Sequence, residues 1–324
     1  MNSPFDIWQL TDGKPGHENQ SLGLIEAIGR RLPVSQPDPA LEHADDTWEH
    51  LASIRRIDLS GTKSLISRLR SAFSQTRGLP TPSLIVGAGH ATHLPMIGLA
   101  RRTGTPCVVL MKPSLPTGLF DLCLVPQHDL HGEMPGDHVV PTVGALNRVH
   151  VEEDVPKSGH LILLGGPSSA HGWDAALTLD AIARVTAATP HQSWALTDSR
   201  RTPEGMREEI RARFPHIELF PHEETDRAWL PARLAGAEEV WVTEDSISMI
   251  YESLSSGARV GLLPVPRKKS GRVARGIDQL IADGLATPYE SWGKTGVLPP
   301  PARTLREADR CAALILERWY PQAR

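Results

Sequence analysis

The feature that most constrains the fold of this chain is an alternation of short apolar runs with segments of helical periodicity, which starts again near residue 160. The apolar runs end in polar loops that contain glycine or proline. This alternation predicts parallel strands joined by helices, with both faces of each sheet covered. At 324 residues the chain is long enough for two domains. We therefore expect an α/β fold of two Rossmann-like parallel domains that face an interdomain cleft.

The periodicity also places the individual elements. In the first half it predicts strands at 6–10, 84–86, 107–111, 121–125 and 139–143, and a helix at 19–31. In the second half it predicts strands at 161–164, 193–196, 217–220, 240–243 and 260–263, and a helix at 173–188. The polar segment 151–159 is the expected linker. We expect domains at 1–153 and 158–302, and a final segment, 303–324, whose amphipathic helix packs back on the first domain.

Composition excludes several classes of protein. Hydrophobic residues make up 40% of the chain and charged residues 22%, which is typical of a soluble globular protein. A net charge of −4 gives no reason to expect a nucleic-acid partner. No apolar run approaches the roughly 20 residues that span a bilayer, and the first residues lack the regions of a secretion signal. Cys107, Cys123 and Cys311 make no metal-type spacing, and two of them lie in apolar runs typical of reduced core thiols. We therefore expect a cytoplasmic protein without a bound metal.

The most informative segment runs from 240 to 265. It is typical of a buried strand, a polar turn, a short helix, a cap at Gly257 and a second buried strand. Asp245 and Ser246 are expected where the helix begins, where open N–H groups and the helix dipole suit a phosphate or diphosphate. Glu252, one to two turns further on, is placed to reach a ribose diol. An ordinary helix cap gives the same pattern, so both interpretations stay open.

Three other loops of the second half are polar and also follow predicted strands. The loop at 165–169 has two glycines, which let a backbone approach a diphosphate closely, although Pro167 removes one donor. The loop at 197–201 adds hydroxyls and two arginines, and the segment 267–275 is basic. Arginine is well matched to phosphate oxygens, while solvated surface arginines are the alternative.

A second distinctive loop follows the first predicted strand and runs from Asp12 to Gln20. Its glycines, including Gly16, permit tight turns, and His17 and Glu18 lie near a helix start that faces the predicted cleft. Histidine titrates near neutral pH and is therefore suited to take a proton from an acceptor hydroxyl. His17 is the preferred base, with Glu18 and Asp12 as alternatives, and a purely structural loop is the other interpretation.

Further strand-end loops of the first half are candidates for the acceptor side. His90 and His93 are three residues apart after one strand, and His128 follows another. Because a third ligand is not evident, we expect the first two to face the cleft and not to bind a metal. Arginines of this half either contact anionic lipids or lie on helix surfaces. They are Arg30, Arg31, Arg55, Arg56, Arg68, Arg70, Arg101 and Arg102.

With these residues identified, the chain resembles the GT-B class of glycosyltransferases. The run Asp245-Ser246-Ile247-Ser248-Met249-Ile250-Tyr251-Glu252, with Gly257 and Leu262-Leu263-Pro264 after it, is similar to the donor motif of the UDP-GlcNAc transferase that makes lipid II. The resemblance implies that Ser246, Ser248 and Met249 contact the diphosphate and that Glu252 holds the ribose. Bulkier residues replace that enzyme's Ser-Gly-Ala turn, and its paired glutamines after the next strand are absent, so the sugar is not implied.

A closer resemblance, over residues 5–320, is to the mitochondrial-fission (elongated-mitochondria) family and its bacterial homologues. It rests on the loop from Asp12 to Gln20 and on four shorter motifs, Gly89-His90-Ala91-Thr92-His93, Pro113-Ser114-Leu115-Pro116, Phe120-Asp121-Leu122 and Pro126-Gln127-His128-Asp129. Bacterial members are regarded as candidate glycosyltransferases of envelope polysaccharide, and some older labels name nucleotide-sugar epimerases. The plant member acts in organelle fission.

The resulting hypothesis is a GT-B-like transferase that moves a sugar from a nucleotide-diphosphate sugar to a lipid- or saccharide-linked hydroxyl, without a metal or other cofactor. A lipid-linked acceptor would bring this cytoplasmic protein to the inner face of the membrane. The candidate catalytic residues are His17, Glu18 and Asp12, and those of the acceptor side are Gly16, His90, His93 and His128. The expected donor contacts are Gly166, Ser168, Ser199, Arg200, Thr243, Asp245, Ser246, Ser248, Met249, Glu252, Lys268 and Arg272.

Three alternatives stay open. Glu244 and Glu252 also fit the E-x7-E spacing of many retaining GT-B enzymes, in which no separate base is needed. A nucleotide-sugar epimerase of the same architecture would place His17, Glu18, His90 and Asp12 around the sugar. A non-catalytic adaptor would keep the fold and bind a partner through its surface.

Overall fold

The computed structural model describes residues 5–33, 52–130, 136–268 and 271–322, without the side chains of 272 and 273. The chain divides into two compact units. Unit 1 comprises residues 1–148 together with 307–324, and unit 2 comprises residues 149–306. The sequence places these boundaries near 153 and 302, a few residues away in each case.

The described residues of unit 1 form a sheet of six parallel strands, with the elements ordered β2-β1-β3-β4-β5-β6. Strands β3 to β5 are continuous apolar runs and are wholly buried, as strands covered on both faces must be. β1 carries Asp6 and Gln9 and is buried over its last five residues. The bounds of these strands, with those of the two edge strands, are β1 Phe5–Thr11, β2 Ala52–Asp58, β3 Leu84–Ala88, β4 Cys107–Leu110, β5 Leu122–Pro126 and β6 Val139–Thr142.

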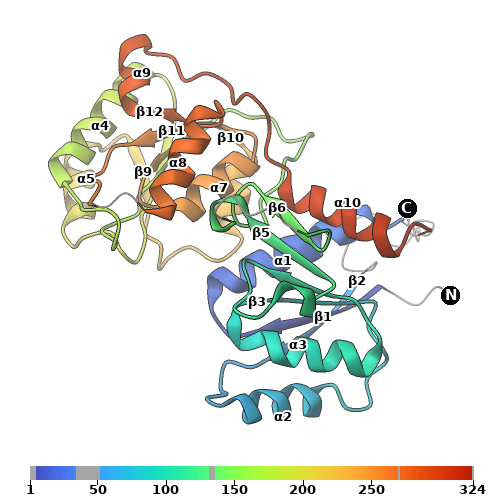
Figure 1. The fold of residues 1–324 in the computed structure, drawn as a ribbon. Helices are drawn as coiled ribbons and strands as arrows, with labels where there is room; N and C mark the ends of the chain where they lie inside the picture. The colour runs from blue at the N-terminus through green and yellow to red at the C-terminus, as the bar shows by residue number, and fades with distance from the viewer. Residues whose placement is uncertain (1–4, 34–51, 131–135, 269–270, 323–324) are drawn as a thin grey trace, which may run out of the picture. The chain divides into compact units, whose positions relative to one another are not determined.

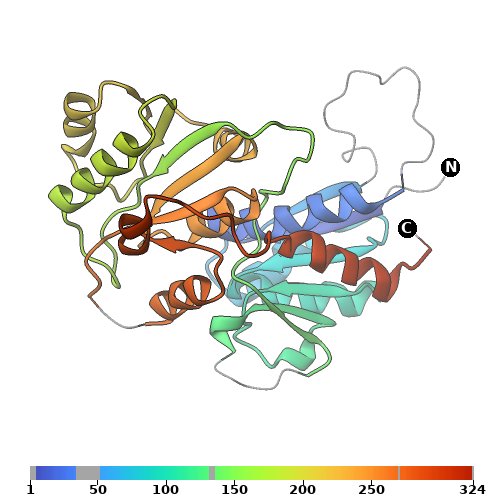
Figure 2. The ribbon, with the colours of Figure 1, turned by 90° about the horizontal axis from the view of Figure 1, so that it is seen from above.

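Four helices cover the two faces of this sheet (Figures 1 and 2). On one face lie α1 (Pro15–Arg31) and α10 (Glu307–Trp319), and on the other lie α2 (Leu65–Gln75) and α3 (His90–Thr103). Two short 3₁₀ turns, η2 (Thr117–Leu119) and η3 (Gln127–Asp129), flank β5.

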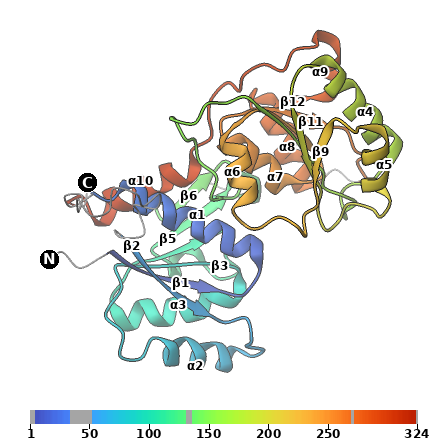
Figure 3. The same cartoon turned by 180° about the vertical axis from the view of Figure 1, so that it is seen from behind.

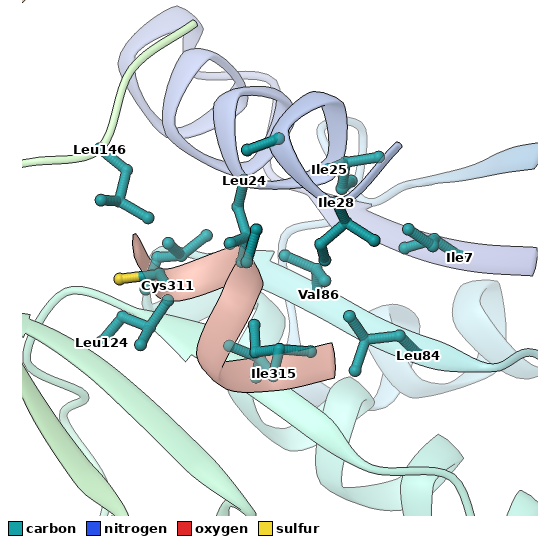
Figure 4. Close-up of a cluster of buried hydrophobic side chains, with 14 of the residues drawn as sticks. Ile7, Leu24, Ile25, Ile28, Leu84, Val86, Leu124, Leu146, Cys311 and Ile315 are labelled. Carbon is teal, nitrogen blue, oxygen red and sulfur yellow. The ribbon is translucent and has the colours of Figure 1, made fainter. Parts of the chain in front are cut away.

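The core of unit 1 joins segments that are far apart in the sequence. Leu24 and Ile28 of α1 pack with Ile315 of α10 above Leu84 and Val86 of β3, as Figure 4 shows. All five side chains are fully buried. The last helix of the described chain is therefore part of the core of the first unit.

Unit 2 also has a sheet of six parallel strands, ordered β12-β11-β10-β7-β8-β9. The strands are β7 Gly159–Leu163, β8 Trp194–Thr197, β9 Ile217–Phe220, β10 Ala237–Thr243, β11 Arg259–Leu263 and β12 Thr287–Pro288. The helices are α4 Ala175–Ala188, α5 Met206–Arg213, α6 Trp229–Ala235, α7 Ile247–Ser255, α8 Arg272–Ala282 and α9 Tyr289–Thr295.

A cluster around Trp241 of β10 marks one face of this sheet. Residues of α4, α5 and α9 pack against it. Because side chains alternate along a strand, Val240 and Val242 point to the other face, where α6 and α7 contact β10 (Figures 1 and 3). Both faces are thus covered, as the apolar runs predict.

The strands and helices predicted from the sequence are present, and their ends differ by a few residues. The first helix begins at Pro15 and not at residue 19, because proline is well suited to the first turn of a helix. The sequence does not predict β2 or β12. None of the helices in the described part of the chain combines the length and apolar character that a bilayer crossing requires.

Each sheet contains one point at which the strand order reverses. In unit 2, β8 and β9 lie on one side of β7, and β10 to β12 lie on the other, so the reversal is between β7 and β10. The reversal in unit 1 lies between β1 and β3. In open parallel sheets, ligands bind at such a reversal. They occupy the crevice at the carboxyl ends of the two strands on either side of it. The topology therefore selects one candidate site in each unit.

We predict that Ile315→Ala lowers the free energy of unfolding of unit 1 by about 2–4 kcal/mol, because it removes a fully buried side chain and leaves a cavity. Denaturant unfolding measures this loss. Ile66→Ala, on the exposed surface of α2, is the matched control and should change stability by less than about 0.5 kcal/mol. Equal effects of the two variants would contradict the packing of α10 in this core.

Candidate functional site

At the reversal in unit 1, the loop after β1 holds a carboxylate–histidine pair. Nδ1 of His17 lies 3.0 and 3.1 Å from the two carboxylate oxygens of Asp12. A carboxylate accepts hydrogen bonds, so Nδ1 of the neutral ring carries the hydrogen and Nε2 is the basic nitrogen. Nε2 has no hydrogen-bond partner in the described part of the chain. The pair is therefore arranged as an oriented base.

Gly89, directly after β3, allows this pair to fit. Its φ of 90° is rarely adopted by residues with a side chain. A Cβ at Gly89 would lie 2.4 Å from Nδ1 of His17 and 2.9 Å from Oδ2 of Asp12. The loops after β1 and β3 consequently meet at the reversal point, and a larger residue would displace the pair.

Glu18 has a different environment from its neighbour His17. Its carboxylate accepts a hydrogen bond from Thr11 Oγ1 at 3.1 Å and forms an ion pair with Arg56 of β2. The side chain is only 5% exposed. Glu18 thus ties the first turn of α1 to two strands, and its charge is already matched.

His93 lies on the buried side of α3, near the same pair. Its Nδ1 is 3.2 Å from Ser114 Oγ, and its ring meets the edge of Phe120 at a centroid distance of 5.5 Å. Burial, with smaller contributions from the charges of His90 and His17, lowers the pKa of His93 to about 4. The ring of His93 is therefore neutral and polar at physiological pH.

The other expected residues of the acceptor side are less closely grouped. His90 is exposed at the start of α3. Gly16 faces open space, since a Cβ there would meet nothing within 4 Å. His128 lies in η3 after β5, and β4 separates that strand from the reversal point.

At the reversal in unit 2, α7 presents an open N-terminus. Ser246 is its N-cap residue and makes no side-chain capping bond. The N–H groups of Ile247, Ser248 and Met249 have no acceptor among the described residues, and the Ser248 side chain is exposed. Open N–H groups at the positive end of a helix dipole bind anions.

The two glycines after β7 serve the protein's own packing. The N–H of Gly165 donates to Thr243 Oγ1 and that of Gly166 to Asp245 Oδ2, each at 2.8 Å. A Cβ at Gly166 would lie 1.9 Å from the carbonyl oxygen of Arg201. Gly166 stays a predicted donor contact, and its N–H is already bonded within the protein.

Asp245 does not cap α7. Its fully buried carboxylate is 2.8 Å from Nη2 of Arg201. Nη1 of the same guanidinium donates to the carbonyl of Gly166 at 2.6 Å. Oδ1 of Asp245 has no hydrogen-bond partner in the described structure. Arg200, the arginine expected at this site, is exposed and makes no hydrogen bond or ion pair with a described residue.

The loop after β7 and the loop after β11 are joined by backbone hydrogen bonds. Gly172 N–H donates to the carbonyl of Pro266 at 2.6 Å, and Lys268 N–H donates to that of Ala170 at 2.8 Å. The Lys268 ammonium is 3.3 Å from the carbonyl of Ser168. This arrangement holds one lysine at the reversal point. Arg272 begins α8, and its side chain lies outside the described part.

The two glutamates of the E-x7-E spacing differ. Glu244 follows β10 and is paired with Arg267 at 3.0 Å, while burial raises the pKa of its carboxyl group. Glu252 is half-buried in the second turn of α7. Ser199, expected at the donor, donates to the carbonyl of Gly165 at 3.0 Å.

One group of side chains in unit 2 has the composition of a metal site. Oxygen and nitrogen atoms of Asp198, His222 and Glu223 lie within 4.8 Å of one another. Arg207 already binds both carboxylates, at 2.5 Å each. Because its guanidinium supplies the charge that a cation would bring, we assign this group as a salt-bridge network.

The two parallel α/β units have a GT-B-like fold. Solved structures that share this fold have low sequence identity to the chain, as three of them show. A candidate UDP-N-acetylglucosamine 2-epimerase from Listeria monocytogenes has a TM-score of 0.60 and 12% identity, with 98% of each chain covered. A UDP-GlcNAc 2-epimerase from Methanocaldococcus jannaschii gives 0.57 and 11%, and MurG from Acinetobacter baumannii gives 0.51 and 12%; each match covers 97% of this chain and 100% of the other.

The chain belongs to the mitochondrial fission ELM1 family, whose model matches residues 15–319. The resemblance found in the sequence is therefore confirmed, and so is the α/β fold of two Rossmann-like parallel domains. Comparison with curated proteins gives no match.

We predict that acidification destabilises the protein partly through His93. Between pH 6.5 and about 4 the unfolded chain binds a proton on this residue that the folded chain does not, so stability falls as pH falls through that window. From pH 7.5 to 4.5 the loss should be about 2–3 kcal/mol smaller in His93→Gln than in the wild type. Denaturant unfolding at both pH values tests this, with the exposed His216→Gln as control; an identical loss in all three proteins would refute it.

Proposed function

We propose that this protein is a metal-independent glycosyltransferase that moves a sugar from a nucleotide-diphosphate sugar to a lipid- or saccharide-linked hydroxyl in envelope polysaccharide synthesis. The open first turn of α7, at the reversal point of unit 2, is the observation that carries the proposal. It offers three N–H donors and the positive end of a dipole where a diphosphate would lie.

Three neighbouring features support a nucleotide diphosphate in unit 2. Arg201 pairs with Asp245 directly before α7, and Lys268 places a second cation against the carbonyl of Ser168, in the loop after β7. The carboxylate of Glu252, one turn beyond Ser248, is the group proposed to bind the ribose diol. Donors and cations of this kind would stabilise the charge that develops on a leaving diphosphate, which is why we propose a reaction without a metal ion.

Unit 1 is proposed to bind the acceptor and to activate its hydroxyl. Nε2 of His17 takes the proton as the hydroxyl attacks the anomeric carbon, and Asp12 stabilises the imidazolium that forms. The ion pair of Glu18 with Arg56 argues against Glu18 as the base. A base that acts directly on the acceptor favours inversion at the anomeric carbon.

The acceptor also bears on where the protein works. We propose a cytoplasmic protein that meets a lipid-linked acceptor at the inner face of the membrane. Some of the arginines that could contact anionic lipids form ion pairs within unit 1 instead. Arg30 pairs with Asp309, and Arg56 pairs with Glu18. Arg102 likewise donates to Thr76. The acceptor itself is therefore the stronger reason for membrane contact.

A nucleotide-sugar epimerase is the second candidate, because Asp12 and His17 form a pair at the strand-end site of unit 1, and Glu18 and His90 lie in the first turns of the helices that follow β1 and β3. The two reactions differ in what they need. An epimerase converts the donor sugar alone and incorporates solvent deuterium, whereas a transferase needs an acceptor and does not exchange that hydrogen. Incubation of the donor alone in deuterium oxide, read by NMR, separates them.

We predict that Ser248→Glu abolishes binding of a nucleotide-diphosphate sugar, because it places a negative charge in the first turn of α7. Calorimetry against UDP-GlcNAc, GDP-mannose, ADP-glucose and dTDP-glucose tests this. An acidic residue in a first helical turn favours the helix, so thermal stability should be kept. Ala176→Glu, at the same position of α4, should bind as the wild type does; if none of these ligands binds the wild type, the transferase proposal fails.

We predict that His17→Gln lowers turnover by about 100-fold or more and leaves donor affinity unchanged, the size expected for a positioned base. Asp12→Asn should lower turnover less and shift its pH profile, because the amide cannot stabilise an imidazolium in the same way. Steady-state kinetics with the donor that the panel selects measures both effects, with His216→Gln as control. Full activity of His17→Gln would remove this residue from the mechanism.

A further inference from the structure

His171 is a buried histidine to which the proposed reaction gives no role. It lies in the loop between β7 and α4 and is 1% exposed, and neither of its ring nitrogens has a hydrogen-bond partner among the described residues. Oδ1 of Asp245 is also buried without a partner. Buried polar atoms in native structures are almost always bonded. Asp245 directly precedes the N-cap residue of α7 and interacts with His171, so two such groups lie close to its open first turn.

Charged groups from three loops act on His171. Burial lowers the pKa of its ring; Asp245, after β10, opposes this, and Arg267 and Arg201 add to it. Of these neighbours, Arg267 is matched by Glu244 and by Asp278 of α8. Lys268 is next to Gly172, since a Cβ there would lie 3.7 Å from its Cε. Before a ligand binds, His171 is therefore neutral and Arg201 is the counter-charge of Asp245.

We propose that His171 takes up a proton from solvent when the donor diphosphate binds, and that the imidazolium then replaces Arg201 as the counter-charge of Asp245. This inference rests on the proposed function, because it requires a diphosphate at the first turn of α7. The Arg201 side chain is 39% exposed and can turn to the phosphate oxygens, which match a guanidinium well.

The departure of Arg201 would leave the fully buried carboxylate of Asp245 with the N–H of Gly166 and no charge partner. A buried unpaired charge is strongly unfavourable. A proton on His171 restores neutrality and gives the ring a second N–H donor, which suits the unpartnered Oδ1 of Asp245. Asp245 thus holds the phosphate-binding arginine in place before the donor arrives, and His171 releases it.

Because binding consumes a proton, donor affinity should fall as pH rises, by up to about tenfold per pH unit. Calorimetry of the full chain at pH 7.5, in buffers of different ionisation enthalpy, measures the protons taken up. The ligands are UDP-GlcNAc, GDP-mannose, ADP-glucose and dTDP-glucose. A sugar diphosphate diester does not titrate near neutral pH, so any proton must go to the protein. We expect uptake that approaches about one proton per donor bound.

Two variants locate the proton. His171→Gln should abolish the uptake and flatten the pH dependence of affinity, while the exposed His191→Gln should keep both. Asp245→Asn keeps the shape of the side chain but removes its charge, so it should also abolish the uptake of a proton on donor binding. It tests the proposal even if His171→Gln does not fold.

Wild-type binding without proton uptake, or an uptake that persists in either variant, would overturn this inference and leave the transferase proposal intact. Failure of every sugar nucleotide to bind the folded wild type would overturn the proposed function itself. The two failures are therefore distinguishable in one experiment.

Discussion

Both candidate sites depend on the reversal of strand order in a parallel sheet. At a reversal, the loops that follow two neighbouring strands lead to helices on opposite faces, so the carboxyl ends of those strands stay uncovered. In unit 1 this brings Asp12 and His17 against Gly89, and in unit 2 it brings the 165–172 loop against Asp245 and α7. The chemistry of each site is thus set by which residues follow those strands.

The sequence predicted the fold well because buried parallel strands are continuous apolar runs with polar ends. It did not predict β2, since Arg55 and Arg56 are exposed on this edge strand and interrupt the run. Two-residue β12 is too short to give a signal. The early start of α1 was missed because a loop with two glycines and a proline does not suggest a helix, although Pro15 in its first turn was a usable clue.

The site was predictable only in part. Residue type and strand-end position pointed to His17 and to the start of α7, but a carboxylate before a helix has the same pattern whether it caps the helix or, like Asp245, turns to an arginine. Neighbouring Arg200 and Arg201 cannot be told apart without the direction of each side chain. His171 belongs to no motif, and its burial depends on a loop pairing with the distant Pro266.

The return of α10 to unit 1 affects the order in which the protein can be built. Unit 2 is one continuous segment, so all of its residues have been synthesised before α10 is made. The core around Leu24 and Ile28 needs Ile315, which is nearly 300 residues away along the chain. Contacts between residues so far apart in the chain form slowly. Until α10 packs on it, an apolar face of α1 stays uncovered. The core of unit 1 can therefore be completed only after the whole of unit 2 has been synthesised.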